Sequence, residues 1–222
     1  MTQTPSPRRA ADHLVDQLVA QGTTHVFGVP GESYLPVLDA MYGREEAIRF
    51  VTCRQEGGAA MAAEAHGKLT GRPGVCMVTR GPGATNASAG VHVAFQDSTP
   101  MILFIGQVAR SMIEREAFQE IDYRRMFGQM AKWVAQIDDA SRIQEYVSRA
   151  YRTALSGRPG PVVLALPEDM LYDEILPPAP PARAVTPRYH PAPEAMDALK
   201  ARLGEARRPL VMAGGGGWTS RL

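Results

Sequence analysis

The sequence predicts an α/β fold, a six-stranded parallel sheet with helices on both faces. Short apolar runs rich in β-branched residues alternate, over about 165 residues, with longer stretches whose apolar residues recur at helical spacing. Glycine or proline stands at most of the boundaries between them. Alternation of this kind implies parallel strands joined by right-handed crossovers.

The first half of this pattern extends to about residue 95. Apolar residues at helical spacing predict a helix over 7–21, and Gly22 ends it. A strand over 26–29 stops at Pro30-Gly31, and a short helix follows near 35–41. The later elements of this half are a strand at 50–53, a helix to about residue 69, a strand at 74–79 and a helix from the glycine-rich loop 81–86 to about residue 95.

The second half supplies three more strands. The run at 101–106 is apolar throughout, as a strand covered on both faces should be. The irregular segment 107–130 follows, and its length predicts a functional loop. Strands at 132–137 and 162–166 enclose a helix over about 143–154.

Three regions are expected along the chain. Residues 1–176 form the α/β domain, and the proline-rich stretch 177–193 is predicted to be an extended linker. A helix over 194–206 and a strand over 210–213 then indicate the start of a second α/β domain. Because one strand cannot form a sheet, residues 194–222 are expected to be an incomplete, truncated part of that domain.

The composition is that of an ordinary globular protein, with 45% hydrophobic and 21% charged residues. The net charge of +1, with interspersed signs, argues against nucleic-acid binding. No apolar run reaches the roughly 18 residues of a membrane span, and the polar N-terminus has no apolar signal region. Cytoplasmic location is therefore expected. Cys53 and Cys76 fall in or beside predicted strands and are interpreted as core residues, so no metal site is predicted.

A carboxylate, Glu56, stands where the second strand runs into a helix. Ligands of open parallel sheets sit at the carboxyl ends of strands, so this is a position for a functional residue. Residues 57–63 offer no cation and no donor side chain. If Glu56 is buried there, it holds its proton more readily than in water and could exchange it near neutral pH. The alternative is a solvated first-turn charge favoured by the helix dipole.

The glycine-rich loop Gly81–Asn86 lies between a strand and a helix. Backbone amides at such a helix start can face an anion or a flat ring. The loop fails the dinucleotide-binding pattern at Asn86, where a glycine would stand, and no acidic residue follows at the required spacing. A nucleotide-binding domain stays as an alternative.

Motifs along the whole first domain resemble the N-terminal pyrimidine-binding domain of thiamine diphosphate enzymes, and within them the acetolactate synthase large subunits. They occur in the family's order: Val26-Phe27-Gly28-Val29-Pro30-Gly31, Arg54-Gln55-Glu56, Gly81-Pro82-Gly83-Ala84-Thr85-Asn86, Gly106-Gln107-Val108, Ala117-Phe118-Gln119-Glu120, Lys132 and Gly157-Arg158-Pro159-Gly160-Pro161-Val162. The expected helix, strand and glycine-rich turn after residue 193 resemble the start of the family's middle domain.

The resemblance implies an enzyme that uses thiamine diphosphate to join 2-oxo acids. Glu56 would bind a ring nitrogen of the cofactor's aminopyrimidine and promote the tautomer that takes a proton from the thiazolium carbon. The resulting carbanion would attack a 2-oxo acid such as pyruvate, carbon dioxide would leave, and the two-carbon unit would pass to a second 2-oxo acid. The implied activity is that of acetolactate synthase, a transferase or lyase of branched-chain amino acid biosynthesis.

The resemblance also implies site residues. Glu56 and Gln119 would be catalytic. The cofactor would be bound by Pro30, Gly31, Glu56, Thr79, Pro82, Gly83 and Asn86, and the substrate side would be formed by Phe118, Gln119 and Lys132. Structural alternatives stay open, with Asn86 as a helix cap, Phe118 as a loop anchor, and Gln119 and Lys132 as surface residues.

Implied cofactors and partners extend beyond this chain. Mg²⁺ and the diphosphate would be held by a C-terminal domain whose Gly-Asp-Gly motif does not occur in these 222 residues, so the chain is expected to be inactive alone. A homodimer or homotetramer is implied, and FAD is left open. Ala109, Glu114 and Glu116 depart from the acetolactate synthase pattern. Another thiamine diphosphate lyase, such as an aldehyde lyase or oxo-acid decarboxylase, and a non-catalytic binding or dimerisation module therefore stay as alternatives.

Overall fold

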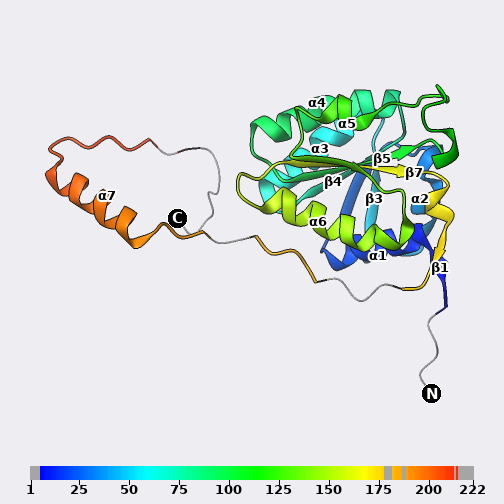
Figure 1. The fold of residues 1–222 in the computed structure, drawn as a ribbon, viewed down its shortest axis with the longest axis horizontal. Coiled ribbons are helices and arrows are strands. Elements are labelled where there is room, and N and C mark those ends of the chain that lie inside the picture. The colour runs from blue at the N-terminus through cyan, green and yellow to red at the C-terminus, as the bar shows by residue number, and fades with distance from the viewer. Residues whose placement is uncertain (1–5, 178–181, 187–188, 213, 215–222) are drawn as a thin grey trace, which may run out of the picture.

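A six-stranded parallel sheet forms the centre of the molecule (Figure 1). The computed structural model describes residues 6–177, 182–186, 189–212 and 214. The strands lie in the order β3-β2-β4-β5-β7-β6, and every neighbouring pair is parallel. The predicted fold class is confirmed. The strand bounds are β2 His25–Gly28, β3 Arg49–Thr52, β4 Gly74–Val78, β5 Met101–Gln107, β6 Trp133–Gln136 and β7 Pro161–Pro167.

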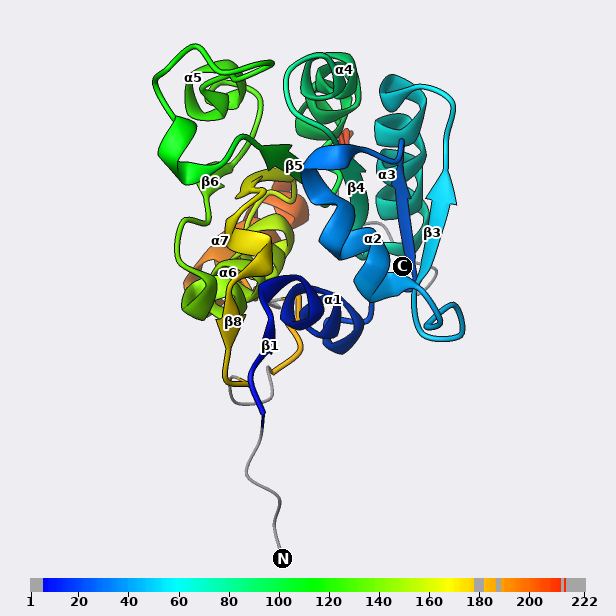
Figure 2. The same ribbon diagram turned by 90° about the vertical axis from the view of Figure 1, so that its right-hand side faces the viewer.

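Helices cover both faces of this sheet, as predicted. Figures 1 and 2 show α1 and α6 on one side and α3, α4 and α5 on the other. The helices are α1 Ala10–Ala20, α2 Leu35–Met41, α3 Glu56–Thr70, α4 Pro82–Gln96, α5 Tyr123–Phe127 and α6 Ile143–Leu155. In β5, Ile102 and Phe104 join the core under α1, α2 and α6, while Leu103 and Ile105 join the core under α3 and α4. This alternation explains why β5 is apolar throughout.

The N-terminus is tied to the segment that follows β7. Arg8–Arg9 form the short strand β1, which pairs antiparallel with β8, Glu174–Ile175. The predicted start of the first helix at residue 7 is therefore wrong, and α1 begins at Ala10. Strands of two residues leave no periodic signal, so this small sheet could not be predicted.

Short helices interrupt the connections between the main elements. The 3₁₀ turns are η1 Glu32–Tyr34, η2 Arg110–Met112, η3 Ala140–Arg142 and η4 Met170–Tyr172. The segment 107–130, predicted to be irregular, contains η2 and α5. Asp122 begins α5 because its side chain accepts hydrogen bonds from the backbone N–H groups of Arg124 and Arg125.

The C-terminal region holds one described helix, α7, Pro193–Glu205, close to the predicted range. The predicted strand is wrong over Leu210–Met212, which are exposed and have no strand partner, while Ala213 lies outside the described residues. A β-strand needs a neighbouring strand to pair with its backbone N–H and C=O groups, and no described strand lies beside this run. The division into domain, linker and second domain stays a prediction. Within the described residues, none of the helices has the length and apolar character needed to cross a bilayer.

The strand order changes direction between β2 and β4. From β2 the chain adds β3 on one side, and from β4 it adds β5 on the other. In open α/β sheets, ligands bind in the crevice beyond the carboxyl ends of the strands at such a switch point. A ligand site is therefore expected at the segments that follow β2, β3 and β4.

Candidate functional site

Glu56 is the first residue of α3, one turn beyond the carboxyl end of β3. The side chain of Gln55 caps this helix by accepting the Gly58 N–H at 2.9 Å. Glu56 is half-buried, not fully enclosed as the sequence suggested. Its Oε2 accepts a hydrogen bond of 2.9 Å from Asn86 Nδ2. Asn86 thus contacts the predicted acid, and the alternative of a cap at its own helix is not what the structure shows.

A close contact between α3 and α4 brings this pair together. A Cβ placed on Gly90 of α4 would lie 2.5 Å from Ala60 Cβ of α3. Glu56 and Asn86 each stand four residues, about one turn, before that contact. The absence of a side chain at Gly90 lets the helices approach until the carboxylate and the amide meet.

Two glycines let the backbone approach Thr79 closely near the carboxylate. A Cβ on Gly31, just after β2, would lie 2.7 Å from Thr79 Cβ. One on Gly83 of α4 would lie 3.0 Å from Thr79 Cγ2 and 3.6 Å from Glu56 Oε1. Thr79 is fixed by a 2.8 Å hydrogen bond between its hydroxyl and Ser33 Oγ.

One oxygen of the Glu56 carboxylate stays available to a ligand that presents a ring nitrogen. Glu56 Oε1 has no hydrogen-bond partner among the residues that the structure describes, whereas Oε2 is held by Asn86. Pro30 is exposed two residues beyond β2, and Pro82 is the exposed first residue of α4. The predicted cofactor residues therefore gather at the switch point, where the carboxylate could hydrogen-bond a ring nitrogen such as that of an aminopyrimidine.

The loop formed by residues 108–122 lies directly on the start of α4. A Cβ on Gly81 would lie 2.8 Å from both Cβ and the backbone oxygen of Gln119, and Gly81 itself has a φ of +56°. The Gly81 N–H donates to the Tyr123 hydroxyl at 3.0 Å. Burial raises the pKa of Tyr123 to about 12, although this hydrogen bond acts in the opposite direction, so the hydroxyl is neutral at physiological pH. Phe118 is 77% exposed.

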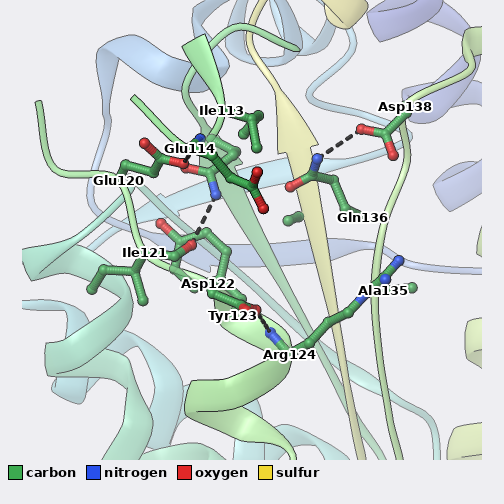
Figure 3. A pocket seen from close by; sticks show the side chains of 12 residues that line it. Ile113, Glu114, Glu120, Ile121, Asp122, Tyr123, Arg124, Ala135, Gln136 and Asp138 are labelled. Carbon is green, nitrogen blue, oxygen red and sulfur yellow. Dashed lines mark hydrogen bonds between the residues drawn. The ribbon is translucent and has the colours of Figure 1, made fainter. Parts of the chain in front are cut away.

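A cavity of about 230 Å³ lies beside this loop and does not include Glu56 (Figure 3). Its rim carries the acidic side chains of Glu114, Glu120, Asp122 and Asp138 and one cation, Arg124. Glu120 accepts the Glu114 N–H at 2.7 Å, and Asp138 accepts Gln136 Nε2 at 2.7 Å. These carboxylates support the loop, and their charge disfavours an anionic ligand there. Among the described residues, no group of three or more His, Cys, Asp or Glu side chains is placed to hold a metal ion.

Lys132 does not lie with the other predicted residues. It immediately precedes β6, and its N–H donates to the Pro161 carbonyl at the start of β7, so it occupies the amino edge of the sheet. Its ammonium donates to the carbonyl oxygens of Thr153 and Ser156 at the end of α6, and partial burial lowers its pKa. Within the described residues Lys132 thus lies apart from Phe118 and Gln119, because a residue that precedes a parallel strand lies at the opposite edge of the sheet, and its substrate-side role stays a prediction.

Residues 8–126 of the chain match the family model of the thiamine pyrophosphate enzymes, N-terminal TPP binding domain; thiamine pyrophosphate is another name for thiamine diphosphate. The chain belongs to this family. The resemblance seen in the sequence is thereby confirmed. The match contains Glu56, the 81–86 loop and Gln119, and ends before Lys132.

Curated relatives of this thiamine pyrophosphate enzyme domain are acetolactate synthases. One from Arthrospira platensis is 38% identical over 210 residues, which cover 91% of this chain and 36% of that protein. The large subunit from Lactococcus lactis is 36% identical over 214 residues, 95% of this chain and 37% of that protein. The mitochondrial enzyme from Schizosaccharomyces pombe is 40% identical over 165 residues, 74% of this chain and 24% of that protein. The chain thus spans a quarter to somewhat over a third of these relatives' lengths.

Sequence reasoning missed several residues that shape the site of this thiamine pyrophosphate enzyme domain. Ser33 holds Thr79, Tyr123 holds Gly81, and Arg80 Nε donates to the Phe118 carbonyl at 3.2 Å. The sequence does indicate that Arg80 has a specific partner. It stands between an apolar strand and the glycine-rich loop, where a buried charge requires an ion pair or hydrogen bond.

Arg110 fastens the beginning of the 108–122 loop. Its Nε donates to Asp169 Oδ2 at 2.8 Å, and its backbone N–H donates to Asp169 Oδ1 at 2.9 Å. A second carboxylate, Asp173, lies 2.9 Å from the same guanidinium. Burial disfavours the charged form of Asp169, but the hydrogen bonds from Arg110 outweigh it and lower the pKa of that carboxyl group.

Replacing Asp169 by Asn is expected to have a pH-dependent effect on stability. Because the folded-state pKa is lowered, the contribution of Asp169 is fully present above the unfolded-state value of about 3.9 and is lost as the pH falls through the folded-state value. We expect D169N to cost roughly 1 kcal/mol in the free energy of unfolding at pH 7, after allowance for solvent screening, and the difference to shrink below about pH 4. Urea unfolding across this pH range measures it.

Asp197→Asn on the exposed helix α7 is the matched control and should leave the free energy of unfolding unchanged. A cost for D169N that is equally large at pH 7 and pH 3 contradicts the assigned ion pair.

Proposed function

We propose that this chain is the pyrimidine-binding part of an acetolactate synthase, which decarboxylates pyruvate and transfers the two-carbon unit to a second 2-oxo acid. The observation that carries the proposal is the Glu56–Asn86 pair, which lies beside Gly83 at the switch point of the sheet and keeps one carboxylate oxygen unpaired among the described residues. The family match and the acetolactate synthase relatives support it.

The proposed role of Glu56 is to hold a proton between its Oε1 and a ring nitrogen of the bound aminopyrimidine. Asn86 keeps the carboxylate in one orientation by occupying Oε2, so Oε1 lies beside Gly83 without a partner among the described residues. Thr79 packs against Gly31 and Gly83, and Pro30 and Pro82 restrict the backbone where the chain leaves β2 and enters α4. Thiamine diphosphate, when bound, supplies the nucleophilic carbon and the electron sink for decarboxylation.

The 108–122 loop is proposed to face the substrate. Gln119 is held against Gly81, at the start of the helix that carries Gly83 and Asn86. Phe118 is exposed on the same loop and offers an apolar surface to a substrate or to a second subunit. We retain Gln119 as a catalytic candidate on this placement, and Phe118 as a substrate-side residue.

The proposed enzyme needs parts other than the described residues. Mg²⁺ and the diphosphate are proposed to bind in a separate domain, contributed by a second copy in a homodimer or homotetramer. Pro82 and Asn86 are exposed beside Glu56, so the candidate site is accessible to such a domain. FAD use and cytoplasmic location stay predictions.

Product analysis of the complete enzyme that carries this chain tests the function. With pyruvate alone we expect acetolactate, and with added 2-oxobutyrate the corresponding mixed 2-hydroxy-2-alkyl acid. A free aldehyde as the only product would replace this proposal with an oxo-acid decarboxylase or aldehyde lyase. Saturable ATP or NAD binding at the 81–86 loop, with no response to thiamine diphosphate, would overturn the cofactor assignment.

The 222-residue chain by itself is expected to release negligible carbon dioxide from pyruvate, even with thiamine diphosphate and Mg²⁺ present. The physical reason is that positioning a reactive cofactor requires its diphosphate to be fixed as well as its pyrimidine. Trapping of labelled carbon dioxide from [1-¹⁴C]pyruvate measures this. Robust release by the purified chain would show that it contains a whole active site.

A further inference from the structure

Arg80 joins three segments that are distant in the sequence. It is the second residue after β4, and its side chain is only 12% exposed. Its Nε donates to the Phe118 carbonyl at 3.2 Å, and its other guanidinium nitrogen donates to Glu168 Oε2 at 2.9 Å. The planar guanidinium therefore holds the 108–122 loop with one edge and the end of β7 with the other.

Two adjacent carboxylates form the ion pairs that hold the two ends of the 108–122 loop. Glu168 and Asp169 follow β7, and the Glu168 N–H donates to the Gln107 carbonyl at 3.0 Å, which extends the β5–β7 ladder. Glu168 pairs with Arg80 near the end of the loop, while Asp169 pairs with Arg110 near its beginning. The loop is thus fixed at both ends to the same dipeptide.

The 108–122 loop contains unfavourable backbone conformations, which contacts with the rest of the domain have to stabilise. Glu114, Glu116 and Gln119 have φ angles of 60°, 52° and 65°, in the left-handed region that non-glycine residues adopt at a cost. Within the loop, Glu120 accepts the N–H groups of Glu114 and Ala117. Gln119 is held from two sides. Arg80 donates to the carbonyl of the preceding residue, Phe118, and Gly81 lies against the Gln119 backbone.

We propose that Arg80 is a positioning residue, which holds the Phe118 carbonyl and thereby keeps Gln119 against Gly81 beside the pyrimidine site. Glu168 orients the guanidinium, and the Arg110–Asp169 pair fixes the other end of the loop. The catalytic consequence rests on the proposed function, whereas the structural consequence does not. Arg80 touches neither Glu56 nor Asn86 in any contact among the described residues, so its effect is confined to the loop.

Backbone hydrogen exchange on the 222-residue chain tests the structural part. For Arg80→Gln we expect the amides of Glu114, Ala117 and Glu120 to exchange about tenfold faster, as loss of a hydrogen bond from a charged group predicts. Protection in β4 and β5 should be unchanged. Arg80→Lys keeps the charge opposite Glu168 but lacks the fork that reaches two acceptors, so the loop amides should again exchange faster.

Arg72→Gln, a change of the same type at an exposed position, is the matched control and should leave these amides unaffected. Unchanged exchange in Arg80→Gln would overturn the proposal. So would equal loss of protection throughout β4 and β5, because it would make Arg80 a general stabiliser of the fold.

Kinetics of the complete enzyme test the catalytic part. We expect Arg80→Gln to raise KM for the 2-oxo acid about tenfold and to leave the activation constant for thiamine diphosphate unchanged. A parallel change in both constants would overturn the positioning role. Absence of 2-oxo acid turnover in the unmodified enzyme would refute the proposed function, and the exchange result would still decide whether Arg80 holds the loop.

Discussion

Glu56→Gln is expected to lower the turnover of 2-oxo acids by the complete enzyme by about a hundredfold or more, the usual contribution of a positioned acid or base. Glutamine has the same shape, and its amide oxygen can still accept the hydrogen bond from Asn86 that the structure shows. It cannot hold and release a proton at the position of Oε1. Steady-state turnover of pyruvate at saturating thiamine diphosphate measures the loss.

The control for this substitution is Glu46→Gln. Glu46 is exposed in the turn before β3, so its neutralisation changes the net charge by the same amount without touching the site. Turnover should be unaffected. Full activity of Glu56→Gln would show that the proton is handled elsewhere, and a loss of folding, measured by circular dichroism, would remove the variant as evidence on catalysis.

Asn86→Ala tests the Glu56–Asn86 pair, because it leaves the carboxylate in place but frees Oε2. This variant should also lower turnover. Unchanged turnover would contradict the orienting role of Asn86.

The central strands β4, β5 and β7 could be predicted because they are buried on both faces. A strand covered by helices on both sides has to be apolar at every position, and such a run is visible without any knowledge of its neighbours. The prediction of 101–106 thus differs from β5 by one residue. The same logic fails for the run at 210–212, because an apolar run identifies a strand only where another strand pairs with it.

The residues of the site were easier to predict than their geometry. Glu56 and Asn86 stand in recognisable motifs, but their contact depends on the approach of two helices at Ala60 and Gly90, which no local pattern encodes. Arg80 was missed for a related reason, since its partners lie 38 and 88 positions away. Lys132 lies apart from the other predicted site residues because it precedes a strand, whereas they follow strands.

Phe104→Ala is expected to be among the most destabilising single substitutions in this chain. Phe104 is 1% exposed in β5, with Met77 of β4 and Leu164 of β7 as its neighbours in the sheet. Truncation removes a buried ring and leaves a cavity, which costs about 3–5 kcal/mol in the free energy of unfolding. Since a typical domain is stable by only about 5–15 kcal/mol, a large part of the stability should be lost.

Phe118→Ala makes the same chemical change at a 77% exposed position and should alter the free energy of unfolding by no more than about 0.5 kcal/mol. Urea unfolding of the two variants, followed by circular dichroism, compares them directly. Equal costs would mean that Phe118 packs onto the domain in solution, which contradicts the exposed loop on which its substrate-side role depends. A cost for Phe104→Ala below about 1 kcal/mol would mean that the core collapses around the cavity, and the close packing between β5 and the helices beneath it would then be in error.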